Sequence, residues 1–261
     1  MNLIQLVFTL TLINIVLVFI IIYTSAQLKK LKILLVAMPL LLSITAWSGM
    51  LLQSIFEIAD FADRQILANI LLTLWAFKFS AYNKNLKIQI LKYLLNKDFH
   101  IIGTGGFEQT GTLLRFIGCF MIVLMPVISL NFLSGNSDLG FLDAFASLVF
   151  VLGAGYEFKA LNELKKLSSN NNDNLNRMGL WFFSRHPDLL GQLISWWGLY
   201  LLALGAYGGE WSIFGPLLIT FLYLRNFLLG VEERLARKYN DYNEYKLSTP
   251  GIFPKVSFLK S

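Results

Sequence analysis

Residues that bind metals or form disulfides are scarce in this sequence. It contains one cysteine, Cys119, and two histidines, His100 and His186, among 261 residues. A single cysteine excludes an intrachain disulfide and a zinc site built on thiolates, and two histidines far apart are a poor ligand set. The HExxH, P-loop and GxGxxG patterns are also lacking. We therefore expect no metal site and none of these nucleotide-binding loops.

Charged residues are scarce as well. They make up 15 % of the chain, whereas about 25 % is typical of a soluble domain, and hydrophobic residues make up 56 %. Apolar runs of about 20 residues recur along the whole chain, a length that matches the hydrocarbon core of a bilayer. The pattern predicts an all-α integral membrane protein, one membrane domain over 1–261 with seven transmembrane helices. The expected spans are 3–24, 33–56, 65–82, 112–133, 139–158, 189–207 and 211–230.

The distribution of charge predicts the orientation of these spans. Loops after the first, third, fifth and seventh spans are rich in lysine and arginine, whereas the other loops hold acidic residues such as Glu57 and Glu210. Of the 22 lysines and arginines, only Arg64 falls in the second group. Because cytoplasmic loops carry the basic excess, we expect the N-terminus outside and the C-terminus in the cytoplasm. The net charge of +6 reflects this topology, and no basic domain suggests a nucleic-acid partner.

The C-terminal tail has a helical pattern of its own. Leu235, Tyr239, Tyr242 and Tyr245 follow one another at spacings of four, three and three, which places them on one face of a helix, and Pro250 ends it. This amphipathic helix could lie on the cytoplasmic surface of the bilayer. Alternatively, it could fold back to close a binding site.

Ionisable residues at the cytoplasmic ends of spans are candidates for function, because charge is unfavourable near lipid. These candidates are Lys78, Arg115, Glu157, Lys159, Asp188, Arg225, Glu232 and Glu233. Lys78, Lys159 and Arg225 could instead extend to lipid headgroups. The group Arg185, His186 and Asp188 suggests a cofactor.

Residues of this group and others near it suit different parts of a nucleotide. Arg185 offers a planar fork for phosphate, and Asp188 and Glu232 can accept hydrogen bonds from ribose or amide groups. Gly191 permits close approach of a backbone or a ligand, and the helix N-terminus here favours anions. His186 could act as a general acid or base, but no residue adjacent in sequence completes a triad.

Two segments resemble a known family. They are "GLWFFSRHPDLLGQLISWWGLYLLAL" and "LLITFLYLRNFLLGVEERLARKYNDYNEYKLSTPGIFP". Together they resemble the steroid 5-alpha-reductase-like membrane family, in its bacterial branch DUF1295. The resemblance is clear over 139–254 and weak in spans two and three, so 1–111 are divergent helices and 112–261 carry the cofactor-binding loops. It implies a bacterial inner-membrane enzyme with a cytoplasm-facing NADPH site. That enzyme would transfer hydride to a double bond conjugated to a carbonyl in a steroid-, fatty- or isoprenoid-like substrate.

The resemblance also implies roles for individual residues. Tyr82 stands where related reductases have a polar ring that can donate to the substrate carbonyl and stabilise its developing charge. The implied cofactor contacts are Lys78, Glu157, Arg185, His186, Asp188, Gly191, Arg225, Glu232, Tyr242 and Tyr245. Several positions depart from the family pattern, among them Lys78, where the family usually has an arginine, and Ile44, where it often has an aspartate. Asp188 replaces an asparagine, Gln192 a glutamate, Leu161 an aspartate and Ser168 a basic residue.

Two other interpretations remain open from the sequence. Isoprenylcysteine and phospholipid methyltransferases share the Arg-His-Pro motif, the paired glutamates and the tyrosine-bearing tail, and their cofactor is S-adenosylmethionine. The WWG that follows the motif, the number of spans and Arg225 favour the reductase branch. A member of the fold without catalytic activity is the third interpretation, suggested by the changes at Leu161 and Ser168.

Overall fold

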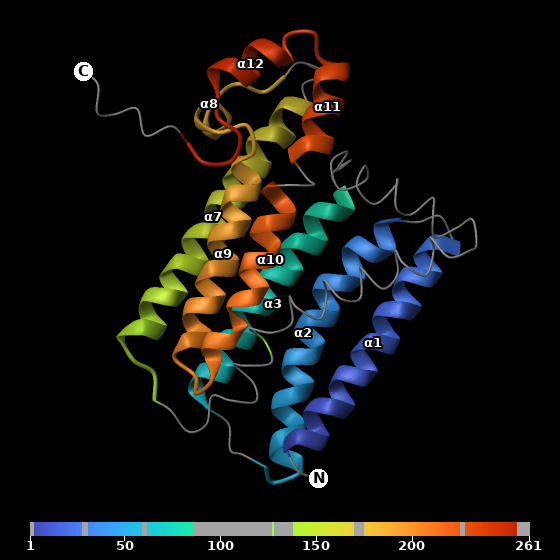
Figure 1. The fold of residues 1–261 in the computed structure, drawn as a ribbon, viewed down its shortest axis with the longest axis vertical. Coiled ribbons are helices and arrows are strands. Elements are labelled where there is room, and N and C mark those ends of the chain that lie inside the picture. The colour runs from blue at the N-terminus through green and yellow to red at the C-terminus, as the bar shows by residue number, and fades with distance from the viewer. Residues whose placement is uncertain are drawn as a thin grey trace. The chain divides into compact units, whose positions relative to one another are not determined.

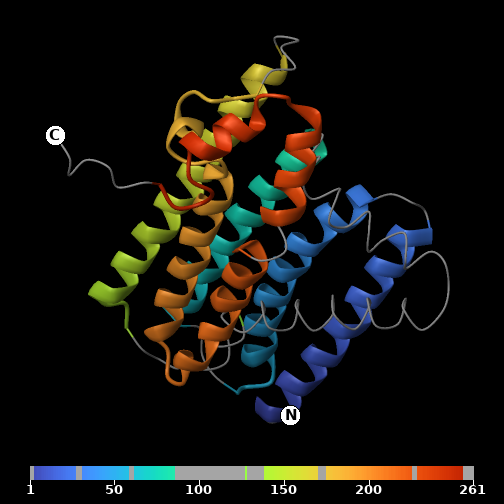
Figure 2. The ribbon, with the colours of Figure 1, turned by 45° about the horizontal axis from the view of Figure 1, so that its top comes forward.

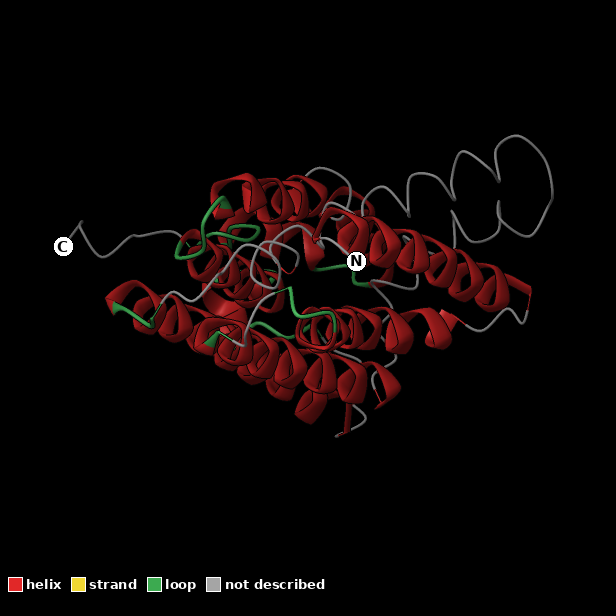
Figure 3. Cartoon of the chain, turned by 90° about the horizontal axis from the view of Figure 1, so that it is seen from below, coloured by secondary structure: helices red, strands yellow, loops and turns green. Residues whose placement is uncertain are grey.

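The structure is a computed structural model that describes residues 3–27, 31–58, 62–85, 127, 138–169, 175–224 and 228–254. Every regular element in these ranges is helical (Figure 3). The elements are α1 (Leu3–Gln27), α2 (Leu31–Ile55), α3 (Asp63–Asn85), α7 (Phe141–Ser169), α8 (Leu180–Phe183), α9 (Pro187–Leu204), η1 (Gly209–Ile213), α10 (Phe214–Leu222), α11 (Leu228–Lys238) and α12 (Tyr242–Ser248).

Three of the described helices are long and apolar enough to cross a membrane. These segments are Leu3–Thr24, Ala37–Ile55 and Phe141–Lys166, and Gly209–Leu222 is a shorter apolar segment. The finding supports an integral membrane protein. The predicted spans at 65–82 and 189–207 fall on α3 and α9, whereas the span at 112–133 lies outside the described residues except for Val127.

The chain divides into two compact units, of which the first comprises residues 1–147 and 199–218. Within it α1 packs against α2, and α2 packs against α3 (Figures 1 and 2). The contact surface of α1 repeats every four residues, because Leu6, Leu10, Asn14, Val18 and Ile22 are all buried. Large apolar side chains elsewhere on α1, such as Phe8 and Phe19, are exposed, as expected of a helix that faces lipid.

Polar side chains join these helices where two of them meet. Thr45 of α2 donates a hydrogen bond of 2.6 Å to Asn14 Oδ1 of α1. Trp47 Nε1 of α2 donates one of 2.9 Å to Thr73 Oγ1 of α3. Such bonds are typical of helices in membranes, where small polar groups find partners across the interface instead of water.

A buried ion pair closes one end of the first unit. Arg64 Nε lies 2.5 Å from Asp143 Oδ1, and Arg64 Nη2 lies 2.8 Å from Asp143 Oδ2. The same guanidinium donates to the carbonyl oxygens of Gly205 and Asp138 at 2.5 Å and 3.1 Å. Arg64 therefore joins the starts of α3 and α7 to the residue that follows α9. It is also the one basic residue that departs from the charge pattern of the loops.

The second unit comprises residues 148–198 and 219–261. Here α7 and α9 are in direct backbone contact (Figure 1). A Cβ atom built on Gly191 would lie 2.4 Å from the backbone nitrogen of Glu157, and one built on Gly198 would lie 2.6 Å from that of Phe150. Glycine is required because any side chain would push the two helices apart. Gly191 thus serves the close backbone approach expected of it, with α7 as the partner.

The tail differs from its prediction. The single helix expected to carry Leu235, Tyr239, Tyr242 and Tyr245 on one face is wrong, because α11 ends at Lys238 and α12 begins at Tyr242. Asn and Asp at positions 240 and 241 occupy the break, and both residue types favour turns by bonding to nearby backbone groups. The end before Pro250 is as predicted, since α12 ends at Ser248.

Candidate functional site

The segment that leads into α9 is held by α7. Gly179 has a positive φ of 62°, and a Cβ atom there would collide with the carboxylate of Glu163. The Glu163 carboxylate accepts a 2.9 Å hydrogen bond from the backbone N–H of Leu180. Trp181 is buried, and its indole N–H donates to the Ala160 carbonyl at 3.1 Å. These contacts fix the loop before it reaches the Arg-His-Pro motif.

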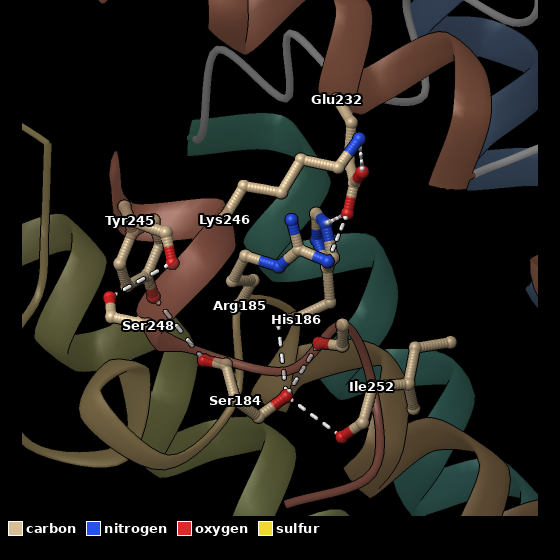
Figure 4. A network of polar contacts seen from close by, with 9 residues as sticks. Ser184, Arg185, His186, Glu232, Tyr245, Lys246, Ser248 and Ile252 are labelled. Carbon is tan, nitrogen blue, oxygen red and sulfur yellow. Dashed lines mark hydrogen bonds and ion pairs between the residues drawn. The ribbon is translucent and has the colours of Figure 1, made fainter. Parts of the chain in front are cut away.

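The other side of the loop is held by the chain after α12. The backbone N–H of Arg185 donates to the Pro250 carbonyl at 2.9 Å, and that of His186 donates to the Gly251 carbonyl at 3.1 Å. Ser184 Oγ lies 2.9 Å and 2.8 Å from the carbonyl oxygens of Gly251 and Ile252, as Figure 4 shows. We call this contact the tail clasp. It supports the prediction in which the tail folds back onto the site.

A tyrosine from α12 adds to the clasp. The Tyr245 hydroxyl donates a hydrogen bond to the carbonyl oxygen of Trp181. The guanidinium of Arg177 lies 5.5 Å from the centre of the Tyr245 ring and is bonded to Asp241 Oδ2 at 2.6 Å. The Tyr245 hydroxyl is therefore engaged within the protein, so its contribution in this arrangement is to position the loop.

Three charged side chains meet above the loop. Glu232 of α11 contacts Arg185 Nη2 through Oε1 and Lys246 Nζ of α12 through Oε2, each at 2.9 Å (Figure 4). The side chains of Arg185 and Glu232 are each 9 % exposed, whereas that of Lys246 is 52 % exposed. Glu232 is thus a buried carboxylate shared by two cations, one inside the protein and one at its surface.

Several buried polar atoms beside this ion-pair group lack partners in the part of the chain that the structure describes. They are Arg185 Nε and Nη1, His186 Nδ1 and Nε2, Asp188 Oδ1 and the Tyr242 hydroxyl. An unsatisfied buried polar group costs about 1–3 kcal/mol, and more if charged, so folds rarely keep several of them together. Their concentration around one loop indicates a place where a polar ligand or water completes the bonding.

Burial sets the protonation of these groups. It lowers the pKa of His186 to about 3, with a further contribution from the positive charge of Arg185. These effects outweigh the Glu232 carboxylate, which lies 4.0 Å from Nε2. His186 is therefore neutral, with one donor and one acceptor nitrogen. Burial raises the pKa of the Tyr242 and Tyr245 hydroxyls above their usual value, so both remain protonated donors.

Below the loop, Asp188 lies near a second carboxylate. Glu157 of α7 is buried and close enough for its charge to act on Asp188. The two residues meet because Gly191, three positions after Asp188, lies against the α7 backbone at Glu157. In the same unit Tyr223 donates a hydrogen bond to Gln192 Oε1. Polar side chains of α7, the first turns of α9 and the residue after α10 therefore lie in the interior of this unit.

A family profile described as "Protein of unknown function (DUF1295)" matches residues 21–249. The chain belongs to the DUF1295 family. No match was found among curated proteins or among solved structures. Within this DUF1295 member, no group of three or more His, Cys, Asp or Glu side chains in the described ranges is placed to hold a metal ion.

Most of the residues predicted for the site lie in the second unit of the DUF1295 chain. This set comprises Glu157, Arg185, His186, Asp188, Gly191, Glu232, Tyr242 and Tyr245. Lys78 belongs to the first unit, where it is part-buried and has an interaction partner. The side chain of Tyr82 and the whole of Arg225 lie outside the described residues. The roles expected of these three remain predictions.

Lys246 and Ser184 were not among the residues predicted for the site. Lys246 follows Tyr245 in a tail with many basic residues. The sequence alone therefore does not distinguish Lys246 from lysines and arginines that are exposed to solvent. Ser184 immediately precedes the Arg-His pair, and a short polar side chain at a helix entrance suggests backbone bonding. That signal was present, although the partner carbonyls lie 67 and 68 residues away in the sequence.

Proposed function

We propose that this protein is a membrane-embedded reductase that transfers a hydride from NADPH to a carbon–carbon double bond conjugated to a carbonyl in a lipid-soluble substrate. The observation that carries the proposal is the incomplete hydrogen bonding of the Arg185 guanidinium. One nitrogen of its buried guanidinium contacts Glu232, while Nε and Nη1 are buried and lack a partner in the described chain. These two N–H groups lie on different edges of the guanidinium, so each can donate a charge-assisted hydrogen bond to a separate anionic oxygen of a phosphate-bearing ligand.

The surrounding residues fit the other parts of such a cofactor. The neutral His186 and the Tyr242 hydroxyl can bond to phosphate, ribose or amide groups, and Asp188 Oδ1 can accept from a hydroxyl. The N-terminus of α9, an 18-residue helix, favours an anion beside the loop. NADPH supplies the hydride when bound, and the protein holds and orients it. Tyr82 remains the expected donor to the substrate carbonyl, and Lys78 and Arg225 remain expected cofactor contacts.

The proposal includes seven transmembrane helices, with the N-terminus outside and the site facing the cytoplasm of a bacterial inner membrane. The ion pair of Arg64 supports this topology, because it joins the starts of α3 and α7 to the residue after α9, three places assigned to the outer side. It also removes the one exception to the charge rule, since Arg64 is buried and paired rather than a free loop charge.

A second candidate is a methyltransferase that uses S-adenosylmethionine. Three carboxyl groups, those of Glu157, Asp188 and Glu232, lie close to the Arg-His-Pro motif, where Arg185 is the buried cation. Such a balance suits a cofactor with a sulfonium and an ammonium better than one with several phosphates. The resemblance to the reductase branch and the buried N–H groups of Arg185 that lack hydrogen-bond partners outweigh this observation.

Cofactor binding distinguishes the two candidates. Detergent-purified protein is titrated with NADPH and with S-adenosylmethionine under the same conditions. We expect NADPH to bind, and Arg185→Gln to weaken binding by about 1.5–3 kcal/mol, the contribution of a charge-assisted hydrogen bond. The matched control is Arg237→Gln, because Arg237 is 82 % exposed on α11 and contacts only Glu233 among the described ion pairs.

Three results would contradict the proposal. Binding of S-adenosylmethionine alone would indicate that the protein is a methyltransferase. Binding of neither cofactor would favour a member of the fold without catalytic activity. NADPH binding that is unchanged by Arg185→Gln would place the cofactor elsewhere.

A further inference from the structure

A carboxylate that meets an arginine inside a protein usually binds it with both oxygens, forming two parallel N–H···O bonds. Glu232 does not bind Arg185 in this way. Only Oε1 contacts the guanidinium, through Nη2, because Oε2 is bound to Lys246 at the same distance of 2.9 Å. Arg185 is left with Nε and Nη1 buried and without partners among the described residues.

We propose that Lys246 is a positioning residue that holds Glu232 Oε2 away from Arg185, so that Nε and Nη1 of Arg185 remain available to an anionic ligand of the phosphate class. This inference rests on the proposed role of Arg185 as an anion-binding residue and assigns its regulation to the tail. Without Lys246, Glu232 would be free to rotate and satisfy the arginine internally. Glu232 would then compete with the ligand for the N–H groups of Arg185.

The surroundings of Lys246 suit this role. Lys246 lies on α12 directly after Tyr245, whose hydroxyl is bonded to the Trp181 carbonyl, so the helix is fixed to the loop that it serves. Its side chain is 52 % exposed, whereas that of Arg185 is 9 % exposed. Lys246 can therefore remain bonded to Glu232 at the surface while a ligand contacts the buried N–H groups of Arg185.

The tail consequently determines affinity without touching the ligand. Any displacement of α12 that separates Lys246 from Glu232 frees this carboxylate to close on Arg185. Docking of the tail and binding of an anion are then linked, and each favours the other.

A double replacement tests the inference on the full-length protein in detergent. NADPH affinity is measured for the parent, Lys246→Gln, Glu232→Gln and the variant with both changes. We expect Lys246→Gln to weaken binding about tenfold or more, because Glu232 then competes for a charge-assisted contact. The variant with both changes should return to within about threefold of the parent, because the competing charge is gone and Glu232, whose two oxygens are bound to Arg185 and Lys246, acts in this inference as an ion-pair partner and not as the cofactor contact expected from the sequence. Arg237→Gln, which removes the same charge from an exposed site, should bind as the parent does.

Recovery in the double variant separates positioning from the other roles of Lys246. If Lys246 contacted the ligand directly, or if its loss merely loosened the tail, removing Glu232 would not restore affinity. Weak binding by the double variant therefore overturns the inference, as does parent-like binding by Lys246→Gln.

Inorganic pyrophosphate, measured by the shift of the thermal unfolding temperature, separates this inference from the proposed function. If pyrophosphate shows the expected pattern across the variants while NADPH does not bind, the reductase proposal fails and the role of Lys246 stands. If neither ligand binds the parent, Arg185 is not an anion-binding residue and the inference is overturned.

Discussion

Replacing Arg64 by methionine should destabilise the first unit more than the replacement of any solvent-exposed residue in that unit. The guanidinium lies 2.5 Å and 2.8 Å from the two oxygens of Asp143 and also binds the carbonyl oxygens of Gly205 and Asp138. After the substitution, the Asp143 carboxylate, whose side chain is 3 % exposed, keeps the N–H of Gly140 at 2.7 Å but loses its counter-charge. Leaving one partner of a buried pair alone costs about 3–5 kcal/mol.

A double-mutant cycle measures how strongly Arg64 and Asp143 stabilise the unit as a pair. The free energy of unfolding is measured in detergent for the parent, Arg64→Met, Asp143→Leu and the variant with both changes. Each single substitution leaves the other member of the buried ion pair without its counter-charge, whereas the double variant removes both charges. We therefore expect the double variant to lose less stability than the sum of the single losses, by about 2 kcal/mol or more. Strictly additive losses would refute the reasoning, because they would mean that the two side chains stabilise the unit independently.

Two further predictions concern the second unit. Gly191→Ala should destabilise it by about 1–3 kcal/mol, because the new methyl group would meet the α7 backbone at 2.4 Å. The control Gly155→Ala should cause no loss in the same unfolding assay, since nothing lies within 4 Å of that position. Equal effects of the two alanines would contradict the packing argument. The second prediction is that stability depends on pH through His186, whose pKa burial lowers to about 3. The unfolded chain takes up this proton below its ordinary pKa of about 6.5, so the contribution is complete above that pH and is lost as the pH falls toward 3. The loss should reach about 1 kcal/mol at pH 5.5, and a His186→Phe variant should lack it. An identical pH profile in that variant would show that other groups are responsible.

The helices were largely predictable because apolar length is a local property of the sequence. The runs at 3–24, 33–56 and 139–158 correspond to α1, α2 and α7, and no tertiary information was needed to find them. The tail was harder. Its tyrosine spacing fits one continuous helix, but turn-forming residues between Lys238 and Tyr242 break it, and periodicity alone does not detect a break between two helices in phase.

The site was predictable where its residues are consecutive and unpredictable where they meet across the fold. Arg185, His186 and Asp188 form one motif whose chemistry can be read directly. The contact between Glu232 and Lys246 depends on the turn between α11 and α12, and the tail clasp joins residues more than 60 positions apart. Such pairings are set by packing, so the sequence does not identify them among many equivalent charges and carbonyls.

The tail clasp also determines when the Arg-His loop can reach its final conformation during synthesis. The carbonyls that hold Arg185 and His186 belong to residues 250 and 251, which follow every described helix. At about 5–20 residues per second, the ribosome needs roughly 3–13 seconds to pass from position 185 to position 250. The transmembrane helices can therefore be inserted while the Arg-His loop still lacks its partner. On the proposed function, a nascent chain would not hold a cofactor until residues 250 and 251 have been made and bonded to the Arg-His loop.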